Sequence, residues 1–214
     1  MKTGWELYVV TDRGLAGGRP LVEVVRQALE GGARIVQLRE KTLPTREMVE
    51  LAAALKELAR DYGARFIIND RVDVALAVDA DGVHLGQEDM PARVARRLIG
   101  PHKILGVSVA SVEEALRARE EGADYLGAGA VFPTATKGEA SVIGLAGLRA
   151  ICTAVDLPVV AIGGIDREKV AEVIAAGAAG IAVVSAVMAA PDPAAAAREI
   201  LLAVEAARRD SGRG

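Results

Sequence analysis

The stretch EGGARIVQLREK, residues 30–41, holds the unit from which the rest of the chain is built. Gly32 follows a helix-like segment, and glycine is the usual residue for the left-handed conformation that ends a helix. Ile35 and Val36 then begin a short apolar run of the kind found in buried parallel strands. The same Gly–Ala pair before an apolar run recurs at residues 63–64, 122–123 and 177–178. The chain therefore repeats a helix, a glycine stop and a short strand.

Working outward from this unit, the pattern predicts strands near residues 7–10, 35–39, 66–68, 82–85, 104–107, 125–128, 159–162 and 180–184. It predicts helices near residues 21–29, 46–62, 72–78, 92–99, 112–121, 145–155, 168–176 and 193–207. Strict alternation of this kind is typical of a (β/α)8 (TIM) barrel, an α/β fold. An open doubly wound sheet is the alternative, but the first strand runs into TDRG, residues 11–14, rather than a glycine-rich nucleotide-binding loop.

No linker divides the 214 residues, so we expect one domain spanning residues 1–214, with 208–214 as a frayed polar tail. The net charge of −3 and the aromatic content of 3% argue against a nucleic-acid surface. A single cysteine, Cys152, excludes an internal disulfide, and no apolar run reaches membrane-spanning length. With no signal-peptide pattern at the start, the sequence predicts a cytoplasmic protein without membrane or nucleic-acid partners. It leaves the oligomeric state open, a homo-oligomer included.

In such barrels the active site lies at the carboxyl ends of the strands. The second strand delivers Gln37, Arg39 and Lys41, which would share one face of an extended chain, while Leu38 and Glu40 would face the helices. An amide and two cations on one face are costly to bury unless an anion meets them. The alternative is a frayed strand end with solvated charges.

Two acids follow the third and fourth strands, namely Asp70 and Asp89. Each alone could cap the helix that comes next. Together, beside Arg39, Lys41 and Asn69, they predict a site for Mg²⁺ and a diphosphate, because Mg²⁺ commonly takes one or two carboxylates together with substrate phosphate oxygens. Asn69 is the only asparagine in the chain; heat resistance and a GC-rich genome would both explain such scarcity.

A second anion site is predicted on the opposite side of the barrel. Gly163–Gly164 follows the seventh strand, and Val184 and Ser185 follow the eighth, where backbone amides grip phosphate in this fold. The alternative is an ordinary glycine turn. The longest irregular stretch, residues 129–143, carries Thr134, Thr136 and Lys137. It is either a lid that closes over substrates or a solvated loop.

The two histidines, His84 and His102, lack the spacing of a zinc site, and we expect His84 to be packed in the core. Cys152 is expected in the core as well. Ser111 with Glu114 is expected to form a capping box.

These residues carry a resemblance to the thiamine-phosphate synthase family. The matching segments are QLREK (37–41), ND (69–70), GVHLGQED (82–89), GVS (106–108), TATK (134–137), IGGI (162–165) and VS (184–185). The resemblance implies a (β/α)8 barrel and a transferase that joins a hydroxymethylpyrimidine diphosphate to a thiazole phosphate, giving thiamine phosphate and diphosphate. Diphosphate would depart first, leaving a pyrimidine-stabilised carbocation that the thiazole nitrogen attacks.

By motif, the resemblance implies a pyrimidine-diphosphate site, a metal site and a thiazole-phosphate site. The first would comprise Gln37, Arg39, Lys41, Asn69, Ser108 and Lys137, with Arg39, Lys41, Ser108 and Lys137 as catalytic residues. Asp70 and Asp89 would bind Mg²⁺, the expected cofactor. The third would comprise Thr134, Ala135, Thr136, Gly164, Val184 and Ser185.

Two other functions are compatible with the fold. A phosphosugar isomerase or tautomerase would use the second anion site alone, with an acid–base residue and no Mg²⁺. Related thiazole tautomerases carry a histidine shortly after the serine of the fifth strand and lack QLREK, whereas here Val109–Ala110–Ser111 follows Ser108. A regulatory barrel that binds a phosphorylated metabolite would have lost the polar cluster on strands two to four, which is intact.

Overall fold

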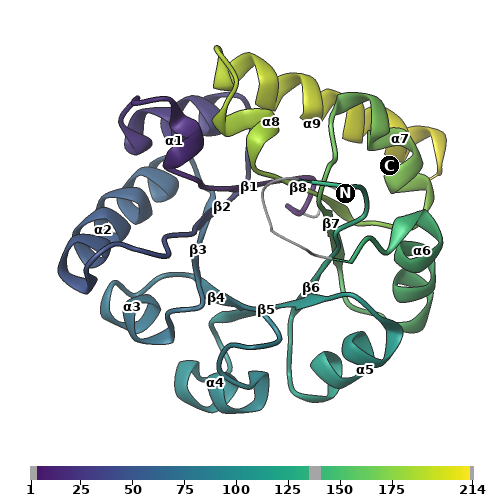
Figure 1. The fold of residues 1–214 in the computed structure, drawn as a ribbon, viewed down its shortest axis with the longest axis horizontal. Coiled ribbons are helices and arrows are strands. Elements are labelled where there is room, and N and C mark those ends of the chain that lie inside the picture. Colours follow the sequence, from purple (N-terminus) through teal and green to yellow (C-terminus); the bar gives the residue numbers. More distant parts are fainter. Residues whose placement is uncertain (1–3, 135–140, 213–214) are drawn as a thin grey trace.

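The computed structural model describes residues 4–134 and 141–212. Its strands form a closed, all-parallel barrel in the order of the chain, and Figure 1 shows them as a ring with the helices outside. The strands are β1 (Leu7–Val10), β2 (Ile35–Leu38), β3 (Arg65–Asn69), β4 (Gly82–Leu85), β5 (Ile104–Val109), β6 (Tyr125–Ala128), β7 (Val159–Ile162) and β8 (Gly180–Val183). The predicted (β/α)8 barrel is confirmed.

The helices that surround the barrel are α1 (Leu21–Glu30), α2 (Thr45–Asp61), α3 (Val72–Ala77), α4 (Ala92–Ile99), α5 (Val112–Glu120), α6 (Gly144–Ala154), α7 (Val170–Ala175), α8 (Ser185–Met188) and α9 (Pro193–Asp210). Short 3-10 turns, η1 (Gly14–Ala16) and η2 (Arg167–Lys169), follow β1 and β7. Among the described residues no helix is long and apolar enough to cross a membrane.

The repeated glycine stop behaves as the sequence predicts. All four glycines adopt the left-handed conformation after a helix, with φ of 104° at Gly32, 62° at Gly63, 92° at Gly122 and 117° at Gly177. Each lets the chain reverse into the next strand without the strain that a side chain would add. The strands that follow are apolar and buried, as expected when helices cover a parallel sheet.

Three differences from the predicted elements affect the site and the carboxyl terminus. Strand β2 ends at Leu38, so Arg39 and Lys41 follow the strand rather than belong to its face. The helix α8 was not predicted, because four residues are too few to show a helical period. Helix α9 continues to Asp210, and Arg208 donates to the carbonyl of Ala179 at 3.1 Å, so residues 208–210 belong to the helix rather than to a frayed tail.

The barrel interior is a separate core from the layer between sheet and helices. Tyr125 on β6 is fully buried there and packs its ring against Trp5, with 4.6 Å between ring centroids. Gly106 on the neighbouring strand makes this possible, since a Cβ at that position would lie 2.2 Å from the Tyr125 ring. The interior cluster comprises Trp5, Tyr8, Val10, Ile35, Ile67, Tyr125, Val160 and Ala182.

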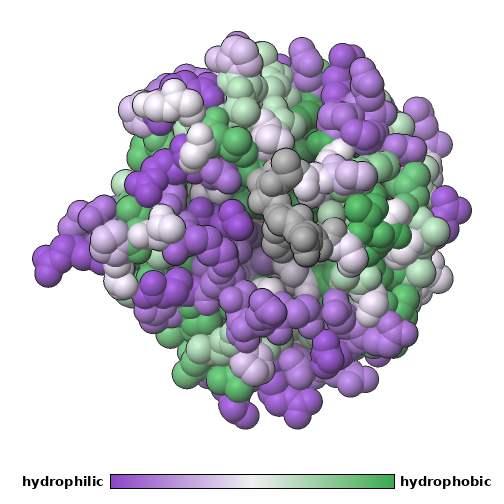
Figure 2. Space-filling model, in the orientation of Figure 1, coloured by the Kyte–Doolittle hydropathy of each residue, from purple (hydrophilic) through white to green (hydrophobic). Residues whose placement is uncertain are grey.

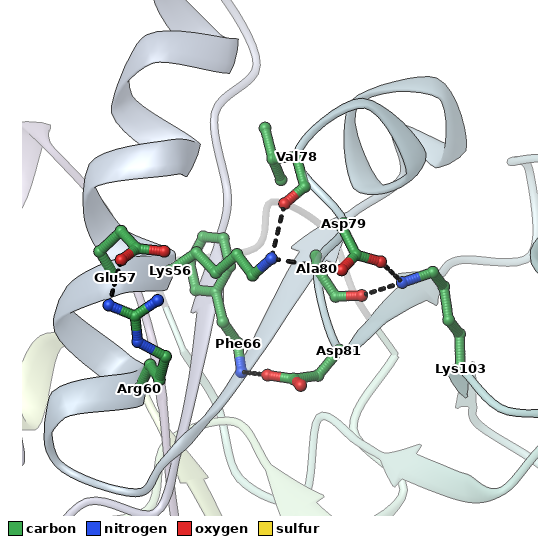
Figure 3. Close-up of polar contacts among 9 residues, drawn as sticks. All are labelled: Lys56, Glu57, Arg60, Phe66, Val78, Asp79, Ala80, Asp81 and Lys103. Atoms are coloured by element: carbon green, nitrogen blue, oxygen red, sulfur yellow. Dashed lines mark hydrogen bonds and ion pairs between the residues drawn. The ribbon is translucent and has the colours of Figure 1, made fainter.

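Two lysines hold the turn between α3 and β4, which leads into the amino-terminal end of β4 (Figure 3). Lys103 donates to the carbonyl of Ala80 at 2.7 Å, and Lys56 donates to that of Val78 at 3.0 Å. Both lysines also reach the carboxylate of Asp79. The turn thus has its carbonyls satisfied by cations, which stabilises a non-glycine residue at φ 54°, Asp79.

The adjacent Asp81 carboxylate accepts the backbone N–H of Phe66 at 2.7 Å (Figure 3). Replacing Asp81 with alanine leaves this part-buried donor without its partner, so we expect the free energy of unfolding to fall by about 1 kcal/mol. Glu57→Ala is the matched control, because it removes a surface ion pair with Arg60 and is expected to change stability by less than about 0.5 kcal/mol. Urea unfolding of both variants measures the difference, and equal midpoints would contradict the role given to Asp81.

Candidate active site

A cavity of about 760 Å³ opens at the carboxyl ends of the strands. Figure 2, drawn in the orientation of Figure 1, shows hydrophilic residues to the left of and below a hollow near the middle of this face. Eight of the predicted site residues lie in the cavity wall: Gln37, Arg39, Asn69, Ser108, Thr134, Gly164, Val184 and Ser185. Ala135, Thr136 and Lys137 lie outside the described residues.

Beside the cavity, the two predicted metal ligands meet. The carboxyl groups of Asp70 and Asp89 are in hydrogen-bonding contact, and Lys41 forms an ion pair with Asp70. Burial, followed by the contact with Asp89, raises the pKa of Asp70. Although burial acts in the opposite sense, the contact with Asp70 and the N–H of Gly86 lower the pKa of Asp89. One raised and one lowered pKa are expected of two carboxyl groups that share a proton. A bound cation would take the place of that proton.

Neither acid caps a helix, so the structural alternative for both is wrong. Helix α3 begins after Arg71 and helix α4 after Pro91, and neither helix has a side-chain cap. Asp89 instead accepts the N–H of Gly86 at 2.7 Å, within its own loop. Asp70 adopts φ 63°, a conformation that few residues other than glycine take and that tends to concentrate at functional sites.

The acid pair suits a hard cation that also binds substrate. In residues 4–134 and 141–212, no group of three or more His, Cys, Asp or Glu side chains could hold a metal. Asp70 and Asp89 contribute two adjacent carboxylates, which are oxygen ligands. This donor set fits Mg²⁺, which completes its shell with water and phosphate oxygens.

The predicted alternation holds at the end of β2, where Gln37 and Arg39 face the cavity and Leu38 packs in the layer under the helices. Gln37 and Arg39 lie in the wall, and the backbone N–H of Arg39 is held by the hydroxyl of Thr11 at 3.0 Å. Lys41 reaches the acid pair instead. Glu40 is buried against Arg13, with 3.4 Å between the charged groups, and burial raises its pKa.

A chain of hydrogen bonds crosses the barrel interior beneath the cavity. The amide nitrogen of Gln37 donates to the hydroxyl of Tyr8 at 2.7 Å, and the Tyr8 and Tyr125 hydroxyls lie 2.8 Å apart. The Tyr125 hydroxyl lies 2.8 Å from Nδ1 of His84, whose Nε2 lies 2.8 Å from Oγ of Ser108. Five residues from five strands are thereby joined.

This chain corrects the interpretation of His84 and adds two residues. His84 is buried, as predicted, but it lines the cavity and bonds Ser108, so it belongs to the site rather than to the apolar core. Tyr8 and Tyr125 were missed because they stand in the apolar runs LYVV and YLGA, which look like core strand. Their signal was chemical: a buried phenol needs a hydrogen-bond partner.

The predicted phosphate end lies across the cavity, after β7 and β8. Gly163 and Gly164 adopt φ of 100° and 65°, and a Cβ on Gly164 would lie 2.5 Å from the carbonyl oxygen of Pro133. Both positions therefore need glycine, because of the positive φ and because neighbouring atoms leave no room for a Cβ. Ser185 begins α8, the short extra helix that contributes to phosphate sites in this fold.

Known proteins of one family are similar to this chain. The chain matches the family model described as thiamine monophosphate synthase over residues 7–187. It is 60% identical over 205 residues to the thiamine-phosphate synthase of Moorella thermoacetica, covering 95% of this chain and 98% of that protein. It is 58% identical over 200 residues to that of Pyrococcus furiosus, covering 94% and 95%.

Among solved structures, the chain is similar to the thiamine phosphate pyrophosphorylase from Pyrococcus furiosus. The TM-score is 0.90 at 55% identity, covering 96% of this chain and 98% of that one. A 3-hexulose-6-phosphate synthase gives a TM-score of 0.67 at 22% identity, covering 92% and 99%, and shows likeness of fold alone.

Proposed function

The chain belongs to the thiamine monophosphate synthase family, and we propose that it catalyses the family's reaction with Mg²⁺ as cofactor. The substrates are 4-amino-2-methyl-5-(diphosphooxymethyl)pyrimidine and 4-methyl-5-(2-phosphooxyethyl)thiazole, and the products are thiamine phosphate and diphosphate. The observation that carries this proposal is the cavity wall, which joins a cation and amides at the ends of β2 and β3 to Gly163–Gly164 after β7 and Ser185 after β8. The acid pair of Asp70 and Asp89 lies beside it.

The two halves of the cavity suit two different substrates. Arg39 and Asn69 lie in the wall on the side of the acid pair, where Lys41 also lies, and would hold the diphosphate. Gly164 and Ser185 lie on the other side and would hold the thiazole phosphate through backbone and hydroxyl groups. Thr134 lines the wall, and the motif assigns Thr136 and Lys137 to the same loop.

The reaction needs charge neutralisation and alignment more than proton transfer. The carbon–oxygen bond breaks with its electron pair on the diphosphate, and the lone pair of the thiazole nitrogen then forms the new carbon–nitrogen bond. No proton moves, because that nitrogen carries none. Arg39 and Lys41 would stabilise the charge that develops on the leaving group, and the two phosphate grips would hold nitrogen and carbon in line.

Magnesium, when bound by Asp70 and Asp89, would supply further positive charge to the departing diphosphate. The adjacent, partly buried carboxylates of Asp70 and Asp89 support this assignment. Lys41, which pairs with Asp70, would then be free to turn toward the substrate.

Product identification tests the proposed function. The purified protein is incubated with Mg²⁺ and both substrates, and the mixture is analysed by mass spectrometry. We expect a product with the mass of thiamine phosphate that is absent when either substrate is left out. If no such product forms while both substrates remain intact, the proposed function is wrong.

A further inference from the structure

The hydrogen-bond chain beneath the cavity has a direction, which its first donor determines. An amide nitrogen carries protons and accepts none. Gln37 therefore donates to the Tyr8 oxygen, and Tyr8 has its single proton left for Tyr125. In this direction Tyr125 in turn donates to Nδ1 of His84, from which it lies 2.8 Å away. With Nδ1 as acceptor, the neutral ring carries its proton on Nε2 and donates it to Oγ of Ser108.

The number of protons fits this direction. Burial raises the pKa of both Tyr8 and Tyr125, so both phenols keep their protons at neutral pH. With a neutral His84 ring, each link of the hydrogen-bond chain has one proton. A charged imidazole would direct a second N–H at Tyr125 and leave a buried phenol proton without an acceptor, which is unfavourable in a dry interior.

The direction leaves each end of the chain with a defined polarity. Gln37 directs one N–H at Tyr8 inside the barrel, so the acceptor it keeps for the cavity is its carbonyl oxygen, beside its second N–H. Ser108 receives a proton from His84, so its own hydroxyl proton is left for the cavity. One end of the chain thus accepts a hydrogen bond from a ligand and the other end donates one.

We propose that Tyr8, Tyr125 and His84 are positioning residues that fix Gln37 as an acceptor and Ser108 as a donor toward the substrate. This proposal rests on the proposed function and gives Gln37 and Ser108 a part in selecting an aminopyrimidine. That ring offers an N–H donor beside ring-nitrogen acceptors. A pyrimidine with an oxo group in place of the amino group would direct an oxygen at the Gln37 carbonyl and lose the bond.

The opposite direction makes a distinct prediction, so the proposal can be tested on the free protein. If the Gln37 amide were turned, its carbonyl would accept from Tyr8 and every link would reverse. His84 would then carry its proton on Nδ1, and Ser108 would donate to Nε2. The tautomer of His84 therefore reports the direction.

Nitrogen-15 NMR of the histidine rings in the full-length protein measures this tautomer directly. The chain has two histidines, and the exposed His102 serves as internal control. At pH 7 we expect a protonated Nε2 and an unprotonated Nδ1 at His84, with His102 showing the average of exchanging forms. A proton on Nδ1, or on both nitrogens, would overturn the proposal.

Variants that remove one hydroxyl separate positioning from packing. Tyr125→Phe keeps the ring but removes the donor to Nδ1, so we expect the His84 signals to shift toward a mixture of tautomers. We also expect kcat/KM for the pyrimidine diphosphate to fall about tenfold, with KM for the thiazole phosphate unchanged. Tyr62→Phe, which removes a surface hydrogen bond to Glu30, is the matched control and should alter neither.

The outcomes distinguish this proposal from the proposed function. His84 signals that stay unchanged in Tyr125→Phe, in a variant that remains folded, would refute the positioning role. The expected tautomer in a protein that forms no thiamine phosphate would support the direction of the hydrogen-bond chain while refuting the proposed function.

Discussion

Replacing Asp70 with asparagine is expected to lower turnover at least about a hundredfold, with little loss of stability. Asparagine keeps the size of the side chain and tolerates the left-handed conformation at φ 63°, so the change isolates the charge. Without that charge the pair with Asp89 offers a single carboxylate, and Mg²⁺ should bind more weakly. Steady-state rates over a range of Mg²⁺ concentrations measure the effect.

Asp73→Asn is the matched control for this prediction. Asp73 lies in the first turn of α3, is exposed and pairs with Arg71, away from the acid pair. We expect wild-type turnover and wild-type Mg²⁺ dependence from this variant. If Asp70→Asn kept wild-type activity at low Mg²⁺, the assignment of Asp70 to the metal would be wrong.

Replacing Gly164 with alanine is expected to damage both the phosphate end and the fold. The added Cβ would lie 2.5 Å from the carbonyl oxygen of Pro133 and 2.8 Å from Cβ of Phe132, so the segment leading to Thr134 must move. We expect KM for the thiazole phosphate to rise at least about tenfold. We expect the free energy of unfolding to fall by about 2–3 kcal/mol, from overpacking added to backbone strain.

Gly63→Ala separates these two contributions. Gly63 has a similar φ, 62°, but a Cβ there meets no atom within 4 Å. This variant should therefore lose only about 1 kcal/mol from backbone strain and bind both substrates normally. Unfolding curves and KM values for the two variants make the comparison. Equal effects would mean that the contact of Gly164 with the Pro133 segment has no part in the site.

Local signals were enough to predict the fold. Each glycine stop, such as Gly32 or Gly177, ends its helix through the conformation of a few neighbouring residues. The buried strand that follows is likewise visible in a short apolar run. The sequence could place the predicted site residues at one face because the carboxyl ends of parallel strands meet there. Asp70 and Asp89 meet for that reason, because they follow the neighbouring strands β3 and β4. From the sequence alone, each could equally have capped the helix that comes next.

The interior of the barrel could not be predicted in the same way. Whether Tyr8 contacts Tyr125 depends on the closure of the barrel and on the space left by Gly106, which no local pattern encodes. His84 looked like core for the same reason: its neighbours in the chain are apolar, while its hydrogen-bond partners come from other strands. The short helix that starts at Ser185 was missed because four residues are too few to show a helical period.

The reaction followed with and without magnesium shows whether the protein is a Mg²⁺-dependent synthase. Both substrates are incubated with the purified protein in Mg²⁺, and in parallel with a chelator, while thiamine phosphate and diphosphate are measured over time. We expect the two products to accumulate in equal amounts with Mg²⁺ and to stop forming under the chelator. An absence of thiamine phosphate in the presence of Mg²⁺, or product formation that the chelator does not change, would contradict the proposed Mg²⁺-dependent synthase.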